Sequence, residues 1–329
     1  MVAIDDQWAQ LAALRFELGE GRVFVDLTKN EHEGDEQEVR DARGKMTQMV
    51  SREEEVYKIN PIWELGEADN TPVIGYTAGS KPGSEIVVLG RHLRRMAEDR
   101  WLNDECVNCF MWLLQQRESA LEDRLPVSFM STHFSNKVLY CALCLQLLSG
   151  TLSPNVLVVY SDECIYIQVA SSTPEEVQRW LRRLVRGGSP FGVSQMYLPF
   201  CVDNYHWVMI RINITRRRIE LYDSMGAGKS PQETTLGFLE KLKALMVFEE
   251  RKLKDRGELP QGMPEVRTWE VASKTEEGTP QQTNHVDCGV FTCMFAYYLS
   301  SGIGLSFEQK DIRTIRKRMT LMILNKSIL

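Results

Sequence analysis

The sequence predicts a packed α+β domain that begins near residue 83 and continues to the end of the chain. Residues 208–214 alternate between apolar and other side chains, which is the period of a strand with one buried face. A tight turn near 215–217 leads to a second strand over 218–222, so the two strands form a hairpin. Residues 287–300 are apolar nearly all round, which is typical of a buried helix. Strands and buried helices therefore share one core.

The remaining elements of this domain follow from periodicity and from helix-end signals. Residues 85–89 indicate a strand, and 104–116 and 134–148 indicate helices with an apolar face. A further helix is expected over 173–187. Its start carries Thr173, Pro174 and Glu176, which match an N-cap, a first-turn proline and a capping box, and Gly187 marks its end.

Residues 1–82 differ in composition from the domain. They contain one short amphipathic helix near the start, a charge-rich stretch over 31–45 and several proline-containing turns. Such a composition buries little apolar surface. We expect this region to be largely flexible and to have a targeting role.

Composition excludes several classes of protein. The chain of 329 residues is 43% hydrophobic and 26% charged, with a formal net charge of -6, so a general nucleic-acid binder is not expected. No apolar run approaches the roughly 18 to 20 residues that span a bilayer, and the acidic N-terminal residues do not resemble a secretory signal. The 8 cysteines are expected to be reduced thiols in the nucleus or cytoplasm.

Cys288 is the candidate nucleophile. It lies at the start of the buried helix, where unpaired N–H groups and the helix dipole favour the thiolate form. Position alone leaves a second interpretation open, because cysteine is often buried as a core residue.

His206 and Asp223 are the candidate base and its orienting acid. His206 opens one strand of the hairpin and Asp223 follows the other, so both lie at the same edge of the sheet. The pair by itself could also be structural. Gln282, shortly before Cys288, could donate to an oxyanion together with the Cys288 N–H, although a glutamine in a polar loop could equally be solvated.

Four segments resemble the SUMO-specific cysteine proteases (the Ulp/SENP type), which are related to adenoviral proteases. They are residues 101–104 (WLND), 205–207 (YHW), 222–224 (YDS) and 281–291 (QQTNHVDCGVF). The order His, Asp, Cys is the order of this family. The resemblance implies a papain-like core with a central mixed or antiparallel sheet flanked by helices, and a monomeric enzyme that needs no metal or organic cofactor.

The same resemblance assigns roles to individual residues. Cys288 matches the nucleophile, His206 the base, Asp223 the orienting acid and Gln282 the oxyanion donor. Trp101 and Trp207 match two tryptophans that form a tunnel over the Gly-Gly tail of the modifier, which glycines can pass because they lack side chains. Asp104 matches an acidic contact to an arginine of the modifier. The implied activity is cleavage after this tail, in SUMO precursors and in SUMO–lysine conjugates.

Two stretches, near 151–172 and 226–262, are longer than the family usually carries, and we expect them to affect which modifier is bound. The first contains an apparent added hairpin and the second a charged helix.

Several alternatives stay open. Two Cys-x-x-Cys pairs, at 106–109 and 141–144, have a spacing that can bind zinc, but both fall among large apolar residues of predicted helices. His285 is a second candidate base with no orienting partner nearby in the sequence. At the level of function, the alternatives are a protease for ubiquitin or a Nedd-type modifier, a catalytically inactive modifier-binding module, and an acetyltransferase.

Overall fold

The centre of the molecule is a five-stranded mixed sheet. The computed structural model describes residues 44–77, 85–121, 126–139, 179, 181–182, 185, 189–226, 233–259, 265–274 and 279–328. The sheet has the order β3-β4-β5-β6-β7. Its strands are β3 (Val127–Phe129), β4 (Gln195–Val202), β5 (His206–Asn213), β6 (Arg218–Tyr222) and β7 (Glu270–Lys274). The three central strands are antiparallel, and the two outer strands add in parallel. The predicted α+β class and mixed sheet are confirmed.

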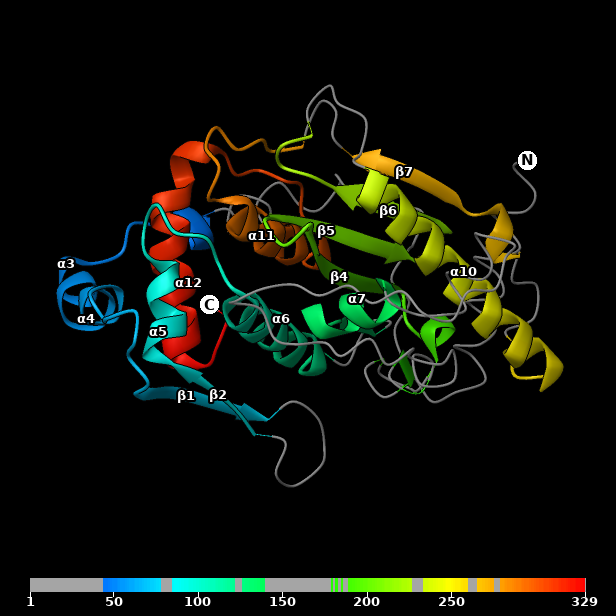
Figure 1. Ribbon diagram of the computed structural model, residues 1–329, viewed down its shortest axis with the longest axis horizontal. Coiled ribbons are helices and arrows are strands. Elements are labelled where there is room, and N and C mark those ends of the chain that lie inside the picture. The colour runs from blue at the N-terminus through cyan, green and yellow to red at the C-terminus, as the bar shows by residue number, and fades with distance from the viewer. Residues whose placement is uncertain are drawn as a thin grey trace.

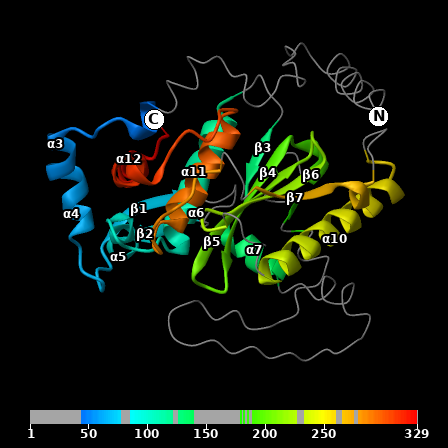
Figure 2. The same cartoon turned by 90° about the horizontal axis from the view of Figure 1, so that it is seen from above.

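Helices cover both faces of this sheet (Figure 2). One face packs against α6 (Asp104–Ser119) and α11 (Cys288–Ser300), with α12 (Ile312–Asn325) behind them. The other face packs against α7 (Thr132–Leu139) and α10 (Glu233–Asp255). Every residue of β5 is therefore buried. The expectation of one buried face for this strand is wrong, because a central strand covered by two helical layers has no solvent-facing side.

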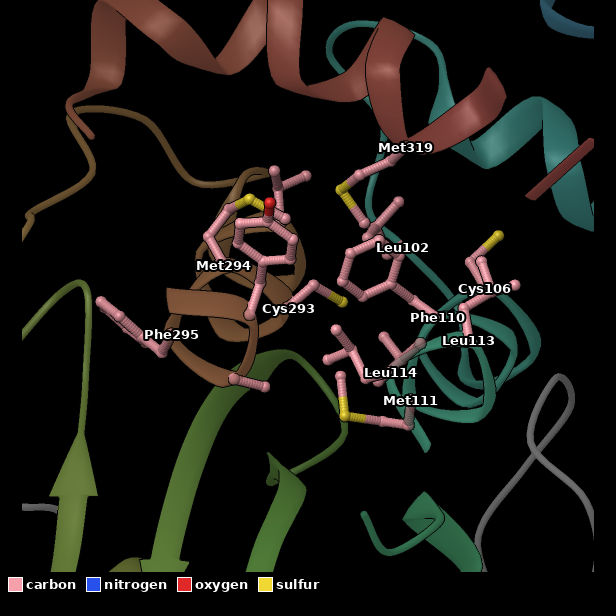
Figure 3. Close-up of a cluster of buried hydrophobic side chains, with 14 of the residues drawn as sticks. Leu102, Cys106, Phe110, Met111, Leu113, Leu114, Cys293, Met294, Phe295 and Met319 are labelled. Atoms are coloured by element: carbon pink, nitrogen blue, oxygen red, sulfur yellow. The ribbon is translucent and has the colours of Figure 1, made fainter. Parts of the chain in front are cut away.

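Helix α11 is held in the largest of the three apolar clusters that the described residues form. Its whole length is buried except for Leu299. Figure 3 shows Phe110 and Leu114 of α6 facing Cys293 and Met294 of α11, with Met319 of α12 closing the cluster. An apolar helix packed on all sides is fixed in position, so the residue at its start is fixed as well.

The packed part of the chain begins well before residue 83. Strand β1 (Pro72–Thr77) pairs with β2 (Glu85–Leu89), so the predicted boundary falls inside a hairpin. Short helices α3 (Arg52–Glu54), η1 (Glu55–Ile59) and α4 (Asn60–Trp63) lie against α12 (Figure 1). The expected flexibility of 1–82 therefore does not apply to 44–77, whose few apolar side chains find partners far away in the sequence. Residues 1–43 lie outside the described residues.

Most other predicted elements agree with the structure where it describes them. The strand over 85–89, the helix from 104, the 206–222 hairpin and the charged helix of the second insert are confirmed as β2, α6, β5–β6 and α10. The first insert and most of the helices predicted over 134–148 and 173–187 lie outside the described residues. Short segments complete the path: α5 (Gly90–Leu93), η2 (Arg94–Met96), η3 (Pro190–Gly192), η4 (Val266–Thr268) and η5 (Gln309–Asp311). Among the described residues, no helix is long and apolar enough to cross a membrane.

Candidate active site

His206 and Asp223 meet at one end of the β5–β6 hairpin. Tyr222 pairs with Met209, so the chain leaves β6 beside the start of β5. His206 Nε2 lies 2.7 Å from Asp223 Oδ1, and the two side chains are 4% and 15% exposed. The Met225 N–H donates to the same carboxylate oxygen at 2.8 Å, which fixes its orientation. The predicted pair is therefore brought together as the hairpin argument requires.

The imidazole of His206 is biased toward its protonated form. Burial by itself lowers the pKa of His206, but the hydrogen bond with Asp223 and the negative charges of Asp223 and the Cys288 thiolate outweigh it and raise the pKa to about 9. The second ring nitrogen, Nδ1, makes no hydrogen bond within the described part of the chain. Asp223 therefore occupies one side of the ring, and the thiol of Cys288 is the other group that acts on it.

Cys288 begins α11 and is 1% exposed. The next residue, Gly289, allows the start of this helix to approach its neighbours. A Cβ at Gly289 would lie 2.8 Å from Leu102 Cβ and 3.2 Å from Trp207 Cδ1. Only a residue without a side chain fits there, so the glycine after the cysteine sets how deeply the thiol is seated.

Both the oxygen and the nitrogen of the Gln282 side-chain amide are hydrogen-bonded. The Ser224 hydroxyl donates to its Oε1 at 2.6 Å, and its Nε2 donates to the Asn284 carbonyl at 2.7 Å. Its backbone N–H also donates to the Ser224 carbonyl at 2.8 Å. An amide nitrogen carries two N–H groups, so the second can be offered to a substrate oxygen. Ser224, which directly follows Asp223, connects this candidate donor to the hairpin of His206 and Asp223.

The two candidate tunnel tryptophans are fixed through their ring nitrogens. Trp101 is 49% exposed, and its Nε1 donates to the His285 carbonyl at 2.6 Å. Trp207 is 4% exposed, and its Nε1 donates to the Leu102 carbonyl at 3.0 Å. Trp101 therefore lies over the loop that leads to Cys288, while Trp207 packs against the start of α11.

Asp104 lies in the first turn of α6 and is partly buried. Burial raises the pKa of this carboxyl, and a hydrogen bond with Thr132 opposes the effect. Its predicted contact with an arginine of the modifier stays a prediction. His285, the other candidate base, is exposed, and it is its backbone carbonyl that holds Trp101.

The cysteine pairs give no metal site in the described chain. Cys106 and Cys109 are both buried inside α6, and burial raises the pKa of each thiol. Within the described ranges, no three His, Cys, Asp or Glu side chains are grouped as metal ligands. The pair at 141–144 lies outside those ranges.

Sequence reasoning did not single out Asp287 and Arg316. Both are buried, and they form an ion pair with 2.6 Å between Arg316 Nη2 and Asp287 Oδ1. Asp287 lies in the 281–291 motif, but only Gln282 and Cys288 of that motif were assigned a role from the sequence. The signal for Arg316 was a charged residue on the apolar stripe of α12, between Ile312, Ile315 and Met319.

A buried cysteine at a helix start, with a histidine and an aspartate at the edge of a mixed sheet, is the arrangement that defines papain-like thiol proteases. Residues 165–328 match the family described as "Ulp1 protease family, C-terminal catalytic domain". Residues 165–328 therefore form a catalytic domain of this family of cysteine proteases.

Known relatives agree with this assignment. The chain is 26% identical to a putative ubiquitin-like-specific protease 1B of Arabidopsis thaliana over 245 residues, which are 74% of this chain and 60% of that protein. It is 25% identical to sentrin-specific protease 2 of Homo sapiens over 280 residues, or 83% of this chain and 39% of that protein. The match thus spans no more than 60% of either relative.

A solved structure shows the same fold. The C-terminal Ulp1 protease domain, in complex with Smt3, the yeast ortholog of SUMO, aligns with a TM-score of 0.57 at 17% identity. The alignment covers 85% of this chain and 97% of that domain.

Proposed function

We propose that this protein is a cysteine peptidase and isopeptidase that cleaves after the C-terminal Gly-Gly of a ubiquitin-like modifier, and that this modifier is SUMO. The observation that carries the proposal is the 2.7 Å contact between His206 and Asp223 beside a thiol at the start of a buried helix. Relatives named as ubiquitin-like-specific and sentrin-specific proteases support the substrate class. Both precursor maturation and release of SUMO from lysine side chains follow from the same chemistry.

The reaction is acyl transfer through the thiol. His206 takes the proton of Cys288 on Nδ1, while Asp223 holds Nε2 and stabilises the imidazolium. The thiolate attacks the carbonyl carbon of the terminal glycine, and the resulting oxyanion accepts hydrogen bonds from the Gln282 amide and the Cys288 N–H. His206 then protonates the departing amine as the C–N bond breaks, which leaves a thioester.

Hydrolysis completes the cycle. Water gives one proton to His206 and attacks the thioester carbonyl, and the C–S bond breaks. The released glycine carboxyl group loses its remaining proton to solvent and leaves as the carboxylate. The Cys288 thiolate remains paired with the protonated His206, ready for the next substrate. No step needs a metal or an organic cofactor.

Substrate selection is assigned to the two tryptophans and Asp104. Trp101 and Trp207 would enclose the Gly-Gly tail, because larger side chains would clash with the indoles. Asp104 would contact an arginine of the modifier. We propose that the protein acts as a monomer in the nucleus or cytoplasm, without a nucleic-acid or membrane partner.

A panel of modifiers with a C-terminal fluorogenic amide tests the proposal. SUMO, ubiquitin and a Nedd-type modifier are offered to the wild type, to Cys288→Ala and to Cys293→Ala. Cys293 is a matched control, because it lies on the same helix and is fully buried, so its thiol has a raised pKa. We expect preferential release from SUMO, abolished only by Cys288→Ala.

Other results would contradict the proposal in distinct ways. Equal or faster release from ubiquitin or the Nedd-type modifier would overturn the substrate. Modifier binding without release would indicate an inactive binding module. Acylation of Cys288 only by acyl-CoA would indicate an acetyltransferase.

A further inference from the structure

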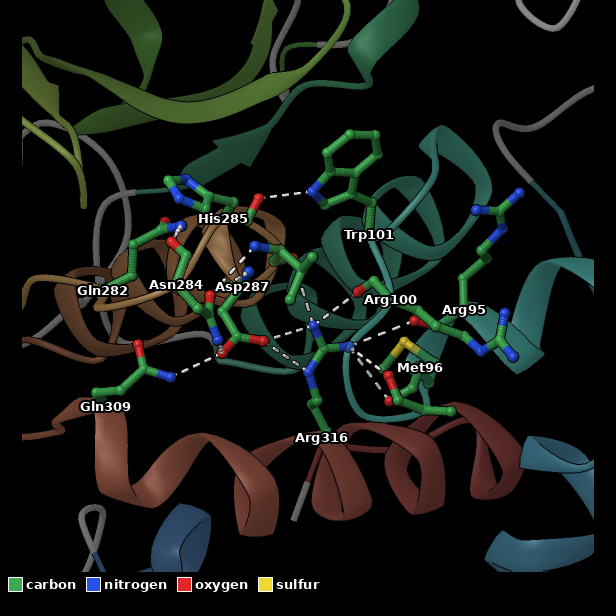
Figure 4. A network of polar contacts seen from close by, with 12 residues as sticks. Arg95, Met96, Arg100, Trp101, Gln282, Asn284, His285, Asp287, Gln309 and Arg316 are labelled. Carbon is green, nitrogen blue, oxygen red and sulfur yellow. Dashed lines mark hydrogen bonds and ion pairs between the residues drawn. The ribbon is translucent and has the colours of Figure 1, made fainter.

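Arg316 is a buried arginine that connects the start of α11, the segment before Trp101 and, through Asp287, the loop of Gln282. It lies on α12 and is 1% exposed. Its Nε and Nη2 both donate to Asp287 Oδ1, at 3.0 and 2.6 Å (Figure 4). Charge-assisted hydrogen bonds of this kind are among the stronger ones in proteins. The guanidinium is therefore anchored directly on the residue before the nucleophile.

The same guanidinium also holds the segment that carries Trp101. Its Nη2 donates to the Arg100 carbonyl at 2.8 Å and its Nη1 to the Ala97 carbonyl at 3.0 Å. Weaker contacts reach the Arg95 and Met96 carbonyls at 3.3 and 3.4 Å. Trp101 follows directly after these carbonyls. One side chain thus fixes the backbone on both sides of the candidate substrate channel.

Asp287 extends the connection into the loop that carries Gln282. Its Oδ2 accepts from Asn284 Nδ2 at 2.6 Å and from Gln309 Nε2 at 2.7 Å. Asn284 Oδ1 accepts from the Asp287 N–H at 3.1 Å, and its carbonyl accepts from Gln282 Nε2 at 2.7 Å. A continuous series of hydrogen bonds therefore runs from Arg316 to the oxyanion donor.

The helix that carries Arg316, α12, is also fixed by contacts on its side away from the site. Lys317 Nζ lies 2.6 Å from Glu55 Oε1, and Arg318 Nε donates to the Gln48 carbonyl at 3.0 Å. The residues around 44–63 thus fix α12 on the side away from the site. Arg316 is a rigid support for the active site because its own helix cannot shift freely.

We propose that Arg316, acting through Asp287, is a positioning residue. It holds Cys288, Gln282 and Trp101 in fixed positions relative to one another. This inference rests on the proposed protease function, since the aligned groups are those of acyl transfer. Misplacement of reacting groups by about 1 Å costs on the order of 100-fold in rate. The network keeps the thiol, the oxyanion donor and the channel wall from moving independently.

Arg316→Lys tests this role with little loss of charge. A lysine ammonium has three donors on a flexible stem and cannot reproduce the guanidinium fork, so it can pair with Asp287 but not also hold the Arg100 and Ala97 carbonyls. Arg313→Lys is the matched control. Arg313 lies on the same helix and contacts the same segment through Glu98 at 2.6 Å, but its side chain is 68% exposed.

The kinetic readout separates positioning from loss of folded protein. Active enzyme is first counted with a SUMO derivative that carries a C-terminal electrophile, and rates are then given per active site. For Arg316→Lys we expect kcat/KM to fall by about 10- to 100-fold, with kcat lowered and KM raised together. The pH at which kcat/KM falls on the alkaline side should be the same as in the wild type, because His206 and Asp223 are unchanged. Arg313→Lys should stay within about 2-fold of the wild type.

A second measurement does not depend on activity. Hydrogen–deuterium exchange should rise in both 95–101 and 282–290 in Arg316→Lys, and in neither segment in Arg313→Lys. If the wild type cleaves no modifier, the proposed function fails, and exchange still decides the inference. Unchanged kcat and KM per active site in Arg316→Lys, or increased exchange confined to α12, would overturn it.

Discussion

Asp223→Asn is the substitution that most directly tests the catalytic pair. Asparagine keeps the size and shape of the side chain but removes the negative charge 2.7 Å from His206 Nε2. The Met225 N–H can still donate to the remaining amide oxygen. The change therefore isolates the electrostatic contribution of Asp223 from its packing.

The magnitude follows from the pKa of His206. The difference between about 9 and the ordinary value of 6.5 corresponds to about 3 kcal/mol in favour of the imidazolium. Asp223 and Cys288 share this stabilisation, so loss of the carboxylate should lower the pKa of His206 by about 1 to 2 units. At pH 8 we expect kcat/KM to fall by about 100- to 10,000-fold, as triad geometry without the correct charge predicts.

The same shift affects stability, with a definite sign. A histidine whose pKa is raised on folding binds a proton more tightly in the folded state, so its contribution is complete below pH 6.5 and is lost as the pH rises through about 9. The free energy of unfolding of the wild type should therefore decrease over this interval because of His206. In Asp223→Asn this decrease should be smaller and should end at a lower pH.

Two measurements check the prediction: the pH dependence of kcat/KM and urea unfolding at several pH values. The wild type should lose activity on an upper limb near pH 9, and Asp223→Asn should lose it at a lower pH. Asp255→Asn, an exposed aspartate at the end of α10, is the control. If Asp223→Asn lost activity at the same high pH as the wild type and Asp255→Asn, the assignment of Asp223 as the group that raises the pKa of His206 would be refuted.

Three further substitutions, two of them paired with a comparison variant, test other parts of the structure. Gln282→Ala should lower kcat by about 100- to 1000-fold with little change in KM, which steady-state kinetics will show, because the oxyanion develops only during the reaction and is absent from the bound substrate. Gly289→Ala should destabilise the protein by about 1 to 3 kcal/mol in urea unfolding, because its Cβ would lie 2.8 Å from a neighbouring side-chain carbon. Gly237→Ala on α10 should instead stabilise it by about 0.5 to 1 kcal/mol, since open space surrounds that position. Trp63→Ala should cost about 2 to 3 kcal/mol in thermal unfolding through lost packing and the 3.0 Å hydrogen bond to α12, whereas Tyr57→Ala, at 76% exposure, should change little.

The hairpin that carries His206 and Asp223 was predicted well from the sequence because its signals are local. His206 and Asp223 are separated by two strands and a tight turn, and alternation fixes where each strand begins and ends. The helix start at Cys288 is local as well. What the alternation could not reveal is that β5 is buried on both faces. Arg211 is on the side of β5 that the alternation predicts to face solvent, yet it is 1% exposed. Its Nη1 lies 3.2 Å from Oε2 of the buried Glu220 on β6.

The largest difference lies in residues 44–77, whose partners are distant in the sequence. Their composition is charged and turn-rich, which is typical of a flexible region. The structure packs Ile59 against Leu321 and bonds Trp63 Nε1 to Thr320 across 257 positions of sequence. A handful of apolar residues is enough to order the segment when a complementary helix already exists, and no pattern within residues 44–77 indicates where in the sequence that helix lies.

The position of Cys288 explains why the buried polar network is needed. The proposed mechanism requires a thiolate at the start of a helix whose remaining residues are almost all in an apolar core, where an unpaired charge is costly. The polar groups are therefore gathered at that one end: His206 beside the thiol, and Asp287, itself 4% exposed, with its carboxylate satisfied by Arg316. Burial of α11 fixes the nucleophile sterically, and the ion pair allows the chain to enter the core there without leaving a charge unpaired. The residue before the candidate nucleophile is therefore held by partners of its own, although the proposed mechanism gives it no part in bond breaking.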